Sequence, residues 1–378
     1  MRLWENSLGF NNLIYIATVL SDIKESHDED PTSVYILLIE EPEAHLHPQL
    51  QVNLYNFIRN ADENENTQVF ITSHSPTLTS KIPLENLILL KDNESFTISN
   101  CFINRAKENI ISDTNTNKKL DDEKANYYKN MITRYLDVTR SQLFFSKGCL
   151  FLEGISEALM VNTFSKLINK TLIDNEIEII NISGTAFYQF IMLCNSTNAT
   201  KRLPLKMAFI TDEDQFTDSK KTEYKIDELI KDNYKKLNEL KISIQKGVQN
   251  RRIANMKSMA NNNDEIKIAS GQKTLEYQIC KANVFEEKDK TKNTSLHQLL
   301  DTLNHDDIIK ADAYVDTIKG TMNDDEQMNA AILYWKCTQI KSEFAQKLTD
   351  FLEESLKKKR VNFTVPLYIQ DAINHLVI

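Results

Sequence analysis

Short apolar runs alternate with helical patterns in the first hundred residues. Leu13–Leu20 is apolar enough for a buried helix, and Val34–Ile39 and Gln68–Ile71 are short runs bounded by polar residues, as buried strands are. Leu50–Arg59, between these two runs, has helical spacing. A strand, a helix and a second strand in this order predict a parallel α/β arrangement.

A second α/β pattern begins near residue 149. The apolar runs Cys149–Leu152, Glu176–Ile182 and Leu205–Ile210 predict strands. The stretches that follow the first two runs, Ile155–Phe164 and Phe187–Leu193, predict helices. Alternating strands and helices are typical of a parallel, Rossmann-like sheet. The chain is therefore expected to be an α/β protein with two parallel sheets.

Polar stretches divide the chain into expected domains. Residues 1–100 form the first domain, residues 101–145 a mostly polar connector, and residues 146–378 the second domain. Two polar inserts interrupt the second domain at about 217–264 and 290–339. Their apolar residues follow helical spacing, so the inserts are expected to form a helical cap beside the second sheet.

Composition limits the class of protein. The chain has 378 residues, enough for two separate cores, and 41% of them are apolar. No apolar stretch approaches the roughly 20 residues that a membrane helix needs, and the N-terminus lacks a signal-peptide layout. The five cysteines are odd in number and show no CxxC spacing, so neither a disulfide framework nor a zinc site is expected. These features predict a cytoplasmic protein without a membrane partner.

The net charge of −9 argues against a surface that binds polyanions everywhere, because phosphate contacts come from Lys and Arg. Local basic pairs, such as Lys235–Lys236 and Arg251–Arg252, lie in the first insert. They suit either a DNA contact or a solvated helix face, and the sequence leaves both interpretations open.

Acidic residues and a histidine follow the two strands of the first domain. Glu40 and Glu41 come directly after one strand, and His74 follows the next. In a nucleoside triphosphatase, acids at a buried strand end hold Mg²⁺ and polarise a water, and a neighbouring histidine reaches the γ-phosphate. A cluster of helix-capping acids is the competing interpretation of Glu40 and Glu41.

A phosphate-binding loop is missing from this sequence. The chain contains only seven glycines and no GxxxxGK[ST] motif, so nothing supplies the backbone N–H groups and lysine that cradle the β- and γ-phosphates. We therefore expect no ATP hydrolysis by this chain alone. The resemblance to ABC-type ATPases described below, a family that carries this loop upstream, implies that ATP would be used only with a completing N-terminal half or a partner. By the same resemblance the chain is interpreted as starting downstream of that half.

Carboxylates gather at two strand ends of the second domain. Glu153 follows the strand at 149–152, Glu157 lies one helical turn later, and Asp212 and Asp214 follow the strand at 205–210. Parallel strand ends meet at one edge of a sheet, and hard carboxylate oxygens prefer Mg²⁺ or Mn²⁺ over zinc. One or two such ions would activate water for phosphodiester cleavage. Taken singly, Glu153 and Glu157 are also typical of a helix start, and Asp212 and Asp214 of a surface turn.

The first domain resembles the C-terminal half of an ABC-type ATPase. Leu37–Glu41 is similar to the Walker B strand, and His74 stands where that family has its switch histidine. Asn6–Gly9 stands at the signature motif but reads NSLG in place of SGGQ. The resemblance implies that Ser7 and Gly9 are signature-like residues and that Glu40, Glu41 and His74 are ATPase residues.

The second domain resembles a Toprim domain through Glu153–Glu157 and Asp212–Asp214. An ABC half followed by Toprim is the order of the OLD (overcoming lysogenization defect) family, which includes the nuclease subunits of Gabija antiphage systems. Lys273–Tyr277, Ile340–Gln346 and Val365–Ile373 resemble later segments of that family. The resemblance spans nearly the whole chain from residue 6 onward.

Site roles follow from this resemblance. It implies that Glu153, Asp212 and Asp214 are metal ligands and that Glu157 and Glu276 serve a second ion. Lys341 would be the cation that stabilises the transition state, and without the motif it would be taken as a solvated helix lysine.

The leading hypothesis is a metal-dependent DNA endonuclease or nickase of the OLD family, acting in antiphage defence, whose ATPase half controls access to DNA. DNA, a second copy of the chain in a homo-oligomer, and an ATPase half or helicase-like protein are the expected partners. The alternative is a non-catalytic assembly or sensor subunit of a defence complex, motivated by the missing phosphate loop and the altered signature.

Overall fold

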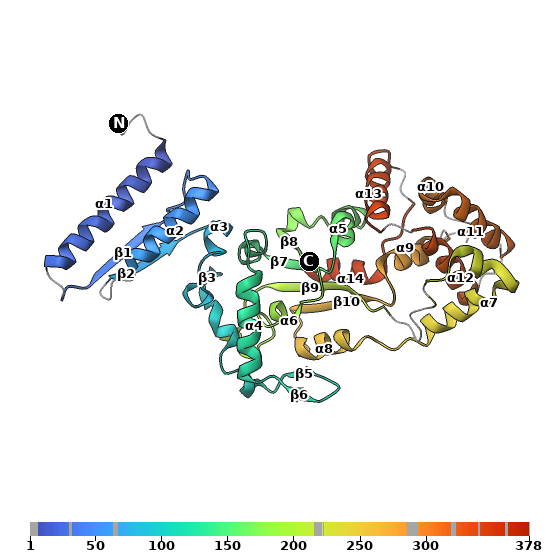
Figure 1. Cartoon of the computed structure of the whole chain (residues 1–378), viewed down its shortest axis with the longest axis horizontal. Helices are drawn as coiled ribbons and strands as arrows, with labels where there is room; N and C mark the ends of the chain where they lie inside the picture. The colour runs from blue at the N-terminus through green and yellow to red at the C-terminus, as the bar shows by residue number, and fades with distance from the viewer. Residues whose placement is uncertain are drawn as a thin grey trace. The chain divides into compact units, whose positions relative to one another are not determined.

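The computed structural model describes residues 7–29, 32–62, 67–214, 221, 223–285, 294–318, 323–338, 341–359 and 362–377. They form two compact units (Figure 1). The first comprises Met1–Asn100 and Lys129–Phe145, and the second comprises Cys101–Tyr128 and Ser146–Ile378. Asn6 of the signature-like motif and Ile340 of the later OLD-like segment lie outside the described residues.

The first unit is built on a pair of parallel strands. Strands β1 (Tyr35–Glu40) and β2 (Thr67–Thr72) pair along their whole length, and helices α1 (Leu8–Glu29) and α2 (Pro48–Asp62) accompany them. One face of the pair packs on the helices through alternate strand residues, namely Leu37, Ile39, Val69 and Ile71. The strand–helix–strand order predicted from sequence is confirmed.

The other face of this strand pair is bare. Ile36 and Leu38 of β1 are 64% and 72% exposed, and Phe70 of β2 is 48% exposed. Strands with period-two side chains bury one face and present the other, and a parallel sheet is normally covered on both. This apolar face is therefore unusual for a parallel sheet.

Smaller elements complete the first unit. Helix α3 (Pro76–Thr79) follows β2, and β3 (Ile88–Lys91) pairs with β4 (Glu94–Thr97) in an antiparallel hairpin. Helix α4 (Asp122–Tyr135) contains the boundary at residue 128 between the two units.

A four-stranded parallel sheet forms the centre of the second unit. Its order is β10 (Ile266–Gly271), β9 (Lys206–Asp212), β7 (Gly148–Leu152) and β8 (Ile177–Asn181). Strand β7 is completely buried, and its Phe151 stacks on Phe209 of β9 at a ring-centroid distance of 4.7 Å. The mixed α/β class with a parallel sheet is confirmed, although β10 was not predicted.

Helices surround this sheet. Helix α5 (Ile155–Leu167) follows β7 and packs on α13 (Lys341–Lys357), and α14 (Leu367–Leu376) packs on β7, β9 and β10. The short α6 (Tyr188–Ile191) and α8 (Arg251–Ala260) contact each other, and α8 also contacts β10. The hairpin of β5 (Ile111–Asp113) and β6 (Lys118–Lys119) lies against α8.

The predicted inserts contain helices. They include α7 (Ile226–Gln245) and α8 in the first insert and α10 (Thr294–Leu303), α11 (His305–Thr317) and α12 (Asp324–Lys336) in the second. Figure 1 shows α7 and α10–α12 grouped with α9 (Leu275–Asn283) beside the sheet. No helix among the described residues is both long and apolar enough to cross a membrane, and all five cysteines are buried free thiols.

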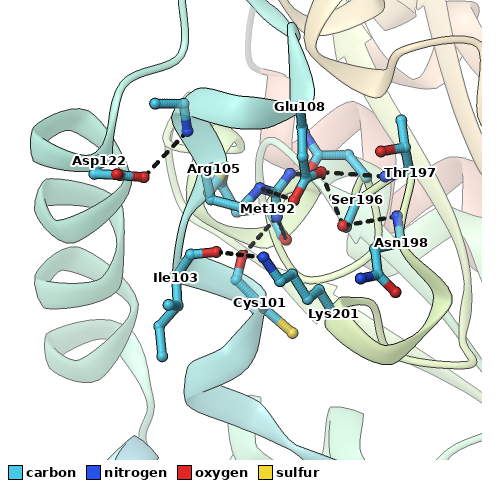
Figure 2. A network of polar contacts seen from close by, with 12 residues as sticks. Cys101, Ile103, Arg105, Glu108, Asp122, Met192, Ser196, Thr197, Asn198 and Lys201 are labelled. Atoms are coloured by element: carbon cyan, nitrogen blue, oxygen red, sulfur yellow. Dashed lines mark hydrogen bonds and ion pairs between the residues drawn. The ribbon is translucent and has the colours of Figure 1, made fainter.

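The stretch at 101–145, predicted to be a connector, is divided between the two units. Its first part contains a buried ion pair of Arg105 and Glu108, and hydrogen bonds of both residues tie this part to the rest of the second unit (Figure 2). Arg105 is fully buried, donates hydrogen bonds to the carbonyls of Cys101 and Met192, and lies 3.3 Å from Glu108. Glu108 in turn accepts hydrogen bonds from the Ser196 hydroxyl at 2.8 Å and from the Thr197 backbone at 3.2 Å. The bonds from Ser196 and Thr197 connect the segment of Arg105 and Glu108 to the segment that leads into β9.

Candidate functional site

The carboxyl ends of β7 and β9 bring Glu153 and Asp212 side by side. Leu152 pairs with Ile210, so Glu153 emerges opposite the last residues of β9. One oxygen of Glu153, Oε2, accepts a hydrogen bond from the Thr211 hydroxyl and lies 3.3 Å from the Asp212 backbone N–H. The adjacency of these two predicted carboxylates follows directly from the strand register.

Arg252 reaches the same strand ends from helix α8. Its Nη2 donates to Oε2 of Glu153 at 3.2 Å, to the Thr211 hydroxyl at 2.8 Å and to the Asp212 carbonyl at 2.8 Å. In the sequence, Arg252 was noted only as a member of the basic pair Arg251–Arg252. Its position at the site depends on how the insert between β9 and β10 folds.

Glu157 and Asp212 share one acidic environment. Glu157 lies in the first turn of α5, and Asp212 accepts a hydrogen bond from the Leu275 N–H at the start of α9, at 3.3 Å. Burial, followed by the charges of Glu157 and Glu276, raises the pKa of Asp212 well above its ordinary value. Burial, with Glu276 and Glu153 adding to it, also raises the pKa of Glu157. The carboxylates thus lie close enough to repel one another.

Two lysines accompany the remaining acids. Lys341 Nζ lies 3.8 Å from Oε2 of Glu276, and Lys273 Nζ lies 3.6 Å from Oδ1 of Asp214. Partial burial acts to lower the pKa of Lys341, but the charges of Glu276, Asp212 and their neighbours outweigh it, so that this pKa is raised. Burial lowers the pKa of Lys273 to about 8, against the opposing effect of Asp214. The structure therefore brings the six residues of the predicted Toprim site into one neighbourhood.

Tyr368 is a further neighbour that the sequence did not single out as a site residue. Its hydroxyl is buried and has no hydrogen-bond partner among the described residues. Burial, followed by the charges of Asp212, Glu157 and Glu276, raises its pKa well above the ordinary value. Its ring also contacts Gly271 closely, because a Cβ at that glycine would lie 3.2 Å from the ring carbon Cζ.

The donor chemistry fits a hard divalent cation. All the candidate ligands are carboxylates, and Oε2 of Glu276 is buried without a hydrogen-bond partner among the described residues, as is the Tyr368 hydroxyl. Buried polar atoms usually have hydrogen-bond partners, so these two oxygens indicate that a ligand or water belongs at the site. Within the described part of the chain, however, no three His, Cys, Asp or Glu side chains converge closely enough to hold an ion. The candidate ligands are thus neighbours, but their oxygens do not converge on one point as they would around a bound ion.

The strand ends of the first unit form a separate polar cluster. Glu41 has a left-handed backbone (φ 42°), and its Oε1 lies 3.4 Å from Nε2 of His74. Glu43, which the sequence did not single out, accepts hydrogen bonds from the Ser73 hydroxyl at 2.6 Å and the His74 N–H at 2.9 Å. Glu43 thereby fixes the loop that carries His74. Glu40 is the last residue of β1.

The signature-like residues have local structural roles. The Ser7 hydroxyl accepts a hydrogen bond from the Phe10 N–H at 3.4 Å, near the start of α1. A Cβ at Gly9 would collide with the His45 carbonyl, so only glycine allows α1 to approach the loop after β1 this closely.

Two protein-family descriptions match this chain. An AAA ATPase domain matches residues 1–79, and the Toprim domain of proteins like the overcoming lysogenization defect protein matches residues 144–214. The two matched regions contain the two clusters of strand-end residues.

Curated relatives match part of the chain. It is 29% identical over 203 residues to endonuclease GajA of Bacillus cereus (strain HuB5-5), covering 49% of this chain and 28% of the relative. It is 22% identical over 213 residues to the OLD nuclease of Thermus scotoductus (strain ATCC 700910 / SA-01), covering 56% of this chain and 36% of the relative. The chain therefore spans well under half the length of these relatives.

Two solved structures, both C-terminal regions of OLD proteins, are distantly similar to this chain. The C-terminal region of the Burkholderia pseudomallei OLD protein is 18% identical, with a TM-score of 0.36, over 61% of this chain and 97% of the other. The C-terminal region of the Xanthomonas campestris pv. campestris OLD protein is 19% identical, with a TM-score of 0.33, over 62% and 94%.

Proposed function

We propose that this chain, which is an OLD-family fusion of an AAA ATPase segment and an OLD-like Toprim domain, is a divalent-metal-dependent DNA endonuclease or nickase. The observation that carries the proposal is the meeting of Glu153 and Asp212 at adjacent strand ends, with Glu157, Glu276 and Lys341 around them. A role in antiphage defence is part of the same proposal.

The residues of the Toprim site would divide into metal ligands and one stabilising cation in this mechanism. Glu153, Asp212 and Asp214 would hold Mg²⁺ or Mn²⁺, and Glu157 and Glu276 would hold a second ion if two are used. Such an ion supplies Lewis acidity and lowers the pKa of a water. The Lys341 ammonium, 3.8 Å from Glu276, would stabilise negative charge that develops on phosphate oxygens.

The Lys341→Met variant is expected to slow conversion of supercoiled plasmid to nicked or linear product by about 10²- to 10³-fold, the usual loss when one electrostatic donor is removed. Lys347→Met is the matched control, because Lys347 lies on the same helix and pairs with Glu343 at 2.9 Å, outside the cluster. Gel assays with Mg²⁺ or Mn²⁺ measure both rates. Equal rates for Lys341→Met and the control would remove Lys341 from the mechanism.

We further propose that the ATPase segment regulates access to DNA and needs a completing half or partner. The bare apolar face of Ile36, Leu38 and Phe70 supports this, because a parallel sheet is stable when both faces are covered. The Glu41–His74 pair lies at the carboxyl edge of the same strands, and the chain contains no glycine-rich loop to bind phosphates there.

The chain alone is expected to release no phosphate from ATP above the buffer rate, because it lacks the glycine-rich loop that binds the β- and γ-phosphates. A malachite-green or coupled-enzyme assay with Mg²⁺ measures this rate. Glu41→Gln is the control variant, and an ATPase rate that Glu41→Gln abolishes would contradict the need for a completing half.

The assembly or sensor alternative makes a different prediction in the plasmid assay. A scaffold would leave the plasmid intact at all Mg²⁺ and Mn²⁺ concentrations, whereas the proposed nuclease cuts it and is stopped by EDTA. Homo-oligomer formation and a helicase-like partner remain predictions.

A further inference from the structure

The carboxylate of Glu153 is held asymmetrically. Three donors converge on its Oε2: the Thr211 hydroxyl, the Arg252 guanidinium at 3.2 Å and the Asp212 backbone N–H at 3.3 Å. No hydrogen bond from the described residues reaches its other oxygen, Oε1. One oxygen is therefore committed to the protein, and the other keeps its full capacity to bind a cation.

The guanidinium of Arg252 is anchored independently of Glu153. Its two shortest contacts, both 2.8 Å, are with the Thr211 hydroxyl and the Asp212 carbonyl, which belong to strand β9. Helix α8 is also fixed at this end, since the Asn250 side chain accepts a hydrogen bond from the Arg252 N–H at 2.9 Å. The position of the guanidinium thus depends on the sheet and the helix cap more than on the carboxylate that it contacts.

We infer that Arg252 is a positioning residue, which acts with Thr211 to hold Oε2 of Glu153 and so present Oε1 to the divalent ion. This inference rests on the proposed metal site. Carboxylates that bind metals are commonly oriented by hydrogen bonds from a surrounding layer of side chains, and loss of one such partner costs about 10- to 100-fold in metal affinity.

The sign of the effect separates positioning from simple charge. Arg252 is a cation next to the ion site, so its charge alone would repel Mn²⁺, and removing it would tighten binding. A positioning role predicts the opposite: Glu153 loses its fixed orientation, and Mn²⁺ binding becomes weaker. The two explanations therefore predict changes of affinity in opposite directions.

Mn²⁺ titration calorimetry of the full chain, without nucleic acid, measures this affinity directly. Arg252→Met is expected to raise the Kd for Mn²⁺ by about 10- to 100-fold. Arg251→Met is the matched control: Arg251 is next in the same helix, but its side chain is 57% exposed and its Nη2 lies 3.4 Å from Asp113. The control Kd should match that of the unaltered chain within about twofold, because Arg251 pairs with Asp113 and, among the described residues, makes no hydrogen bond or ion pair with Glu153 or Thr211.

Two conservative variants make the test independent of whether Arg252→Met folds. Arg252→Lys keeps the charge but loses the planar donor group, so it should also weaken Mn²⁺ binding. Thr211→Val should weaken binding in the same direction, and combining it with Arg252→Lys should give less than the sum of the two effects, because both act through Oε2. Thermal melts followed by circular dichroism identify the variants that fold.

The outcomes distinguish this inference from the proposed function. Unchanged or tighter Mn²⁺ binding by the folded Arg252 variants, with normal binding by the unaltered chain, overturns the positioning role and leaves the metal site intact. Absence of Mn²⁺ binding by the unaltered chain overturns both. Weaker binding by the Arg252 and Thr211 variants, with a normal Arg251→Met control, supports the inference.

Discussion

Asp212→Asn is expected to abolish metal-dependent plasmid cleavage and, at the same time, to raise the melting temperature of the metal-free chain. Cleavage should fall by about 10³-fold or more, because the variant loses an ionised ligand at the centre of the cluster. Stability should rise because the amide removes the cost of burying a charged carboxylate and the repulsion from Glu157 and Glu276. Each kcal/mol recovered in a domain of this size corresponds to about 2–4 °C in the melting temperature.

The pH dependence of this stability gain has a defined sign. The pKa of Asp212 is raised in the folded protein, so the folded state binds this proton more tightly than the unfolded state does. Below the ordinary carboxylate pKa, Asp212 is protonated in both the folded and the unfolded state. The cost of ionising it in the folded state is then absent. As the pH rises toward the raised pKa, the folded state loses stability, and the cost is complete above it. The difference between Asp212→Asn and the unaltered chain should therefore be small near pH 4 and largest at alkaline pH.

Melting curves in EDTA at a series of pH values measure this difference, and plasmid gels measure the loss of cleavage. Asp174→Asn, an exposed change in the same unit, is the control for a general effect of removing one negative charge. Undiminished cleavage by Asp212→Asn would reject the site. An equal stability gain from Asp174→Asn would reject the explanation by burial and local repulsion of the Asp212 charge.

The sequence predicted the central carboxylates because their signals are local. An apolar run followed by an acid places Glu153 and Asp212 at strand ends, and parallel pairing then brings neighbouring strand ends together. Glu276 and Lys341 carried no such signal and were found only through the family resemblance. Their contact at 3.8 Å joins the first turns of α9 and α13, which are far apart in the sequence.

The supporting residues could not be predicted because their signals are not local. Arg252 looks like a solvated helix residue until the insert folds back to β9, and Tyr368 looks like a core aromatic until α14 packs beside the cluster. Strand β10 was missed because Ile266–Gly271 mixes apolar residues with Lys and Ser, and its burial comes from pairing with β9. Polar composition at 101–145 similarly concealed buried side chains such as Arg105 and Ile110.

Arg105→Met is expected to destabilise the second unit by about 3–5 kcal/mol, the usual cost of leaving a buried charge without its partner. Arg105 is fully buried, and its loss would leave Glu108 with the Ser196 hydroxyl and the Thr197 N–H as its hydrogen-bond donors among the described residues (Figure 2). Urea unfolding followed by circular dichroism measures the change. Lys107→Met is the control, because Lys107 is exposed in the same short helical segment.

Combining Arg105→Met with Glu108→Gln tests the origin of this cost. A glutamine keeps an oxygen that accepts from Ser196 and Thr197 but carries no charge, so the double variant should recover part of the lost stability. Recovery should be incomplete, because Arg105 also donates to the Cys101 and Met192 carbonyls, which would stay unpaired. A double variant less stable than Arg105→Met alone would show that Glu108 stabilises this segment through its own hydrogen bonds, and that the buried charge is not the source of the cost.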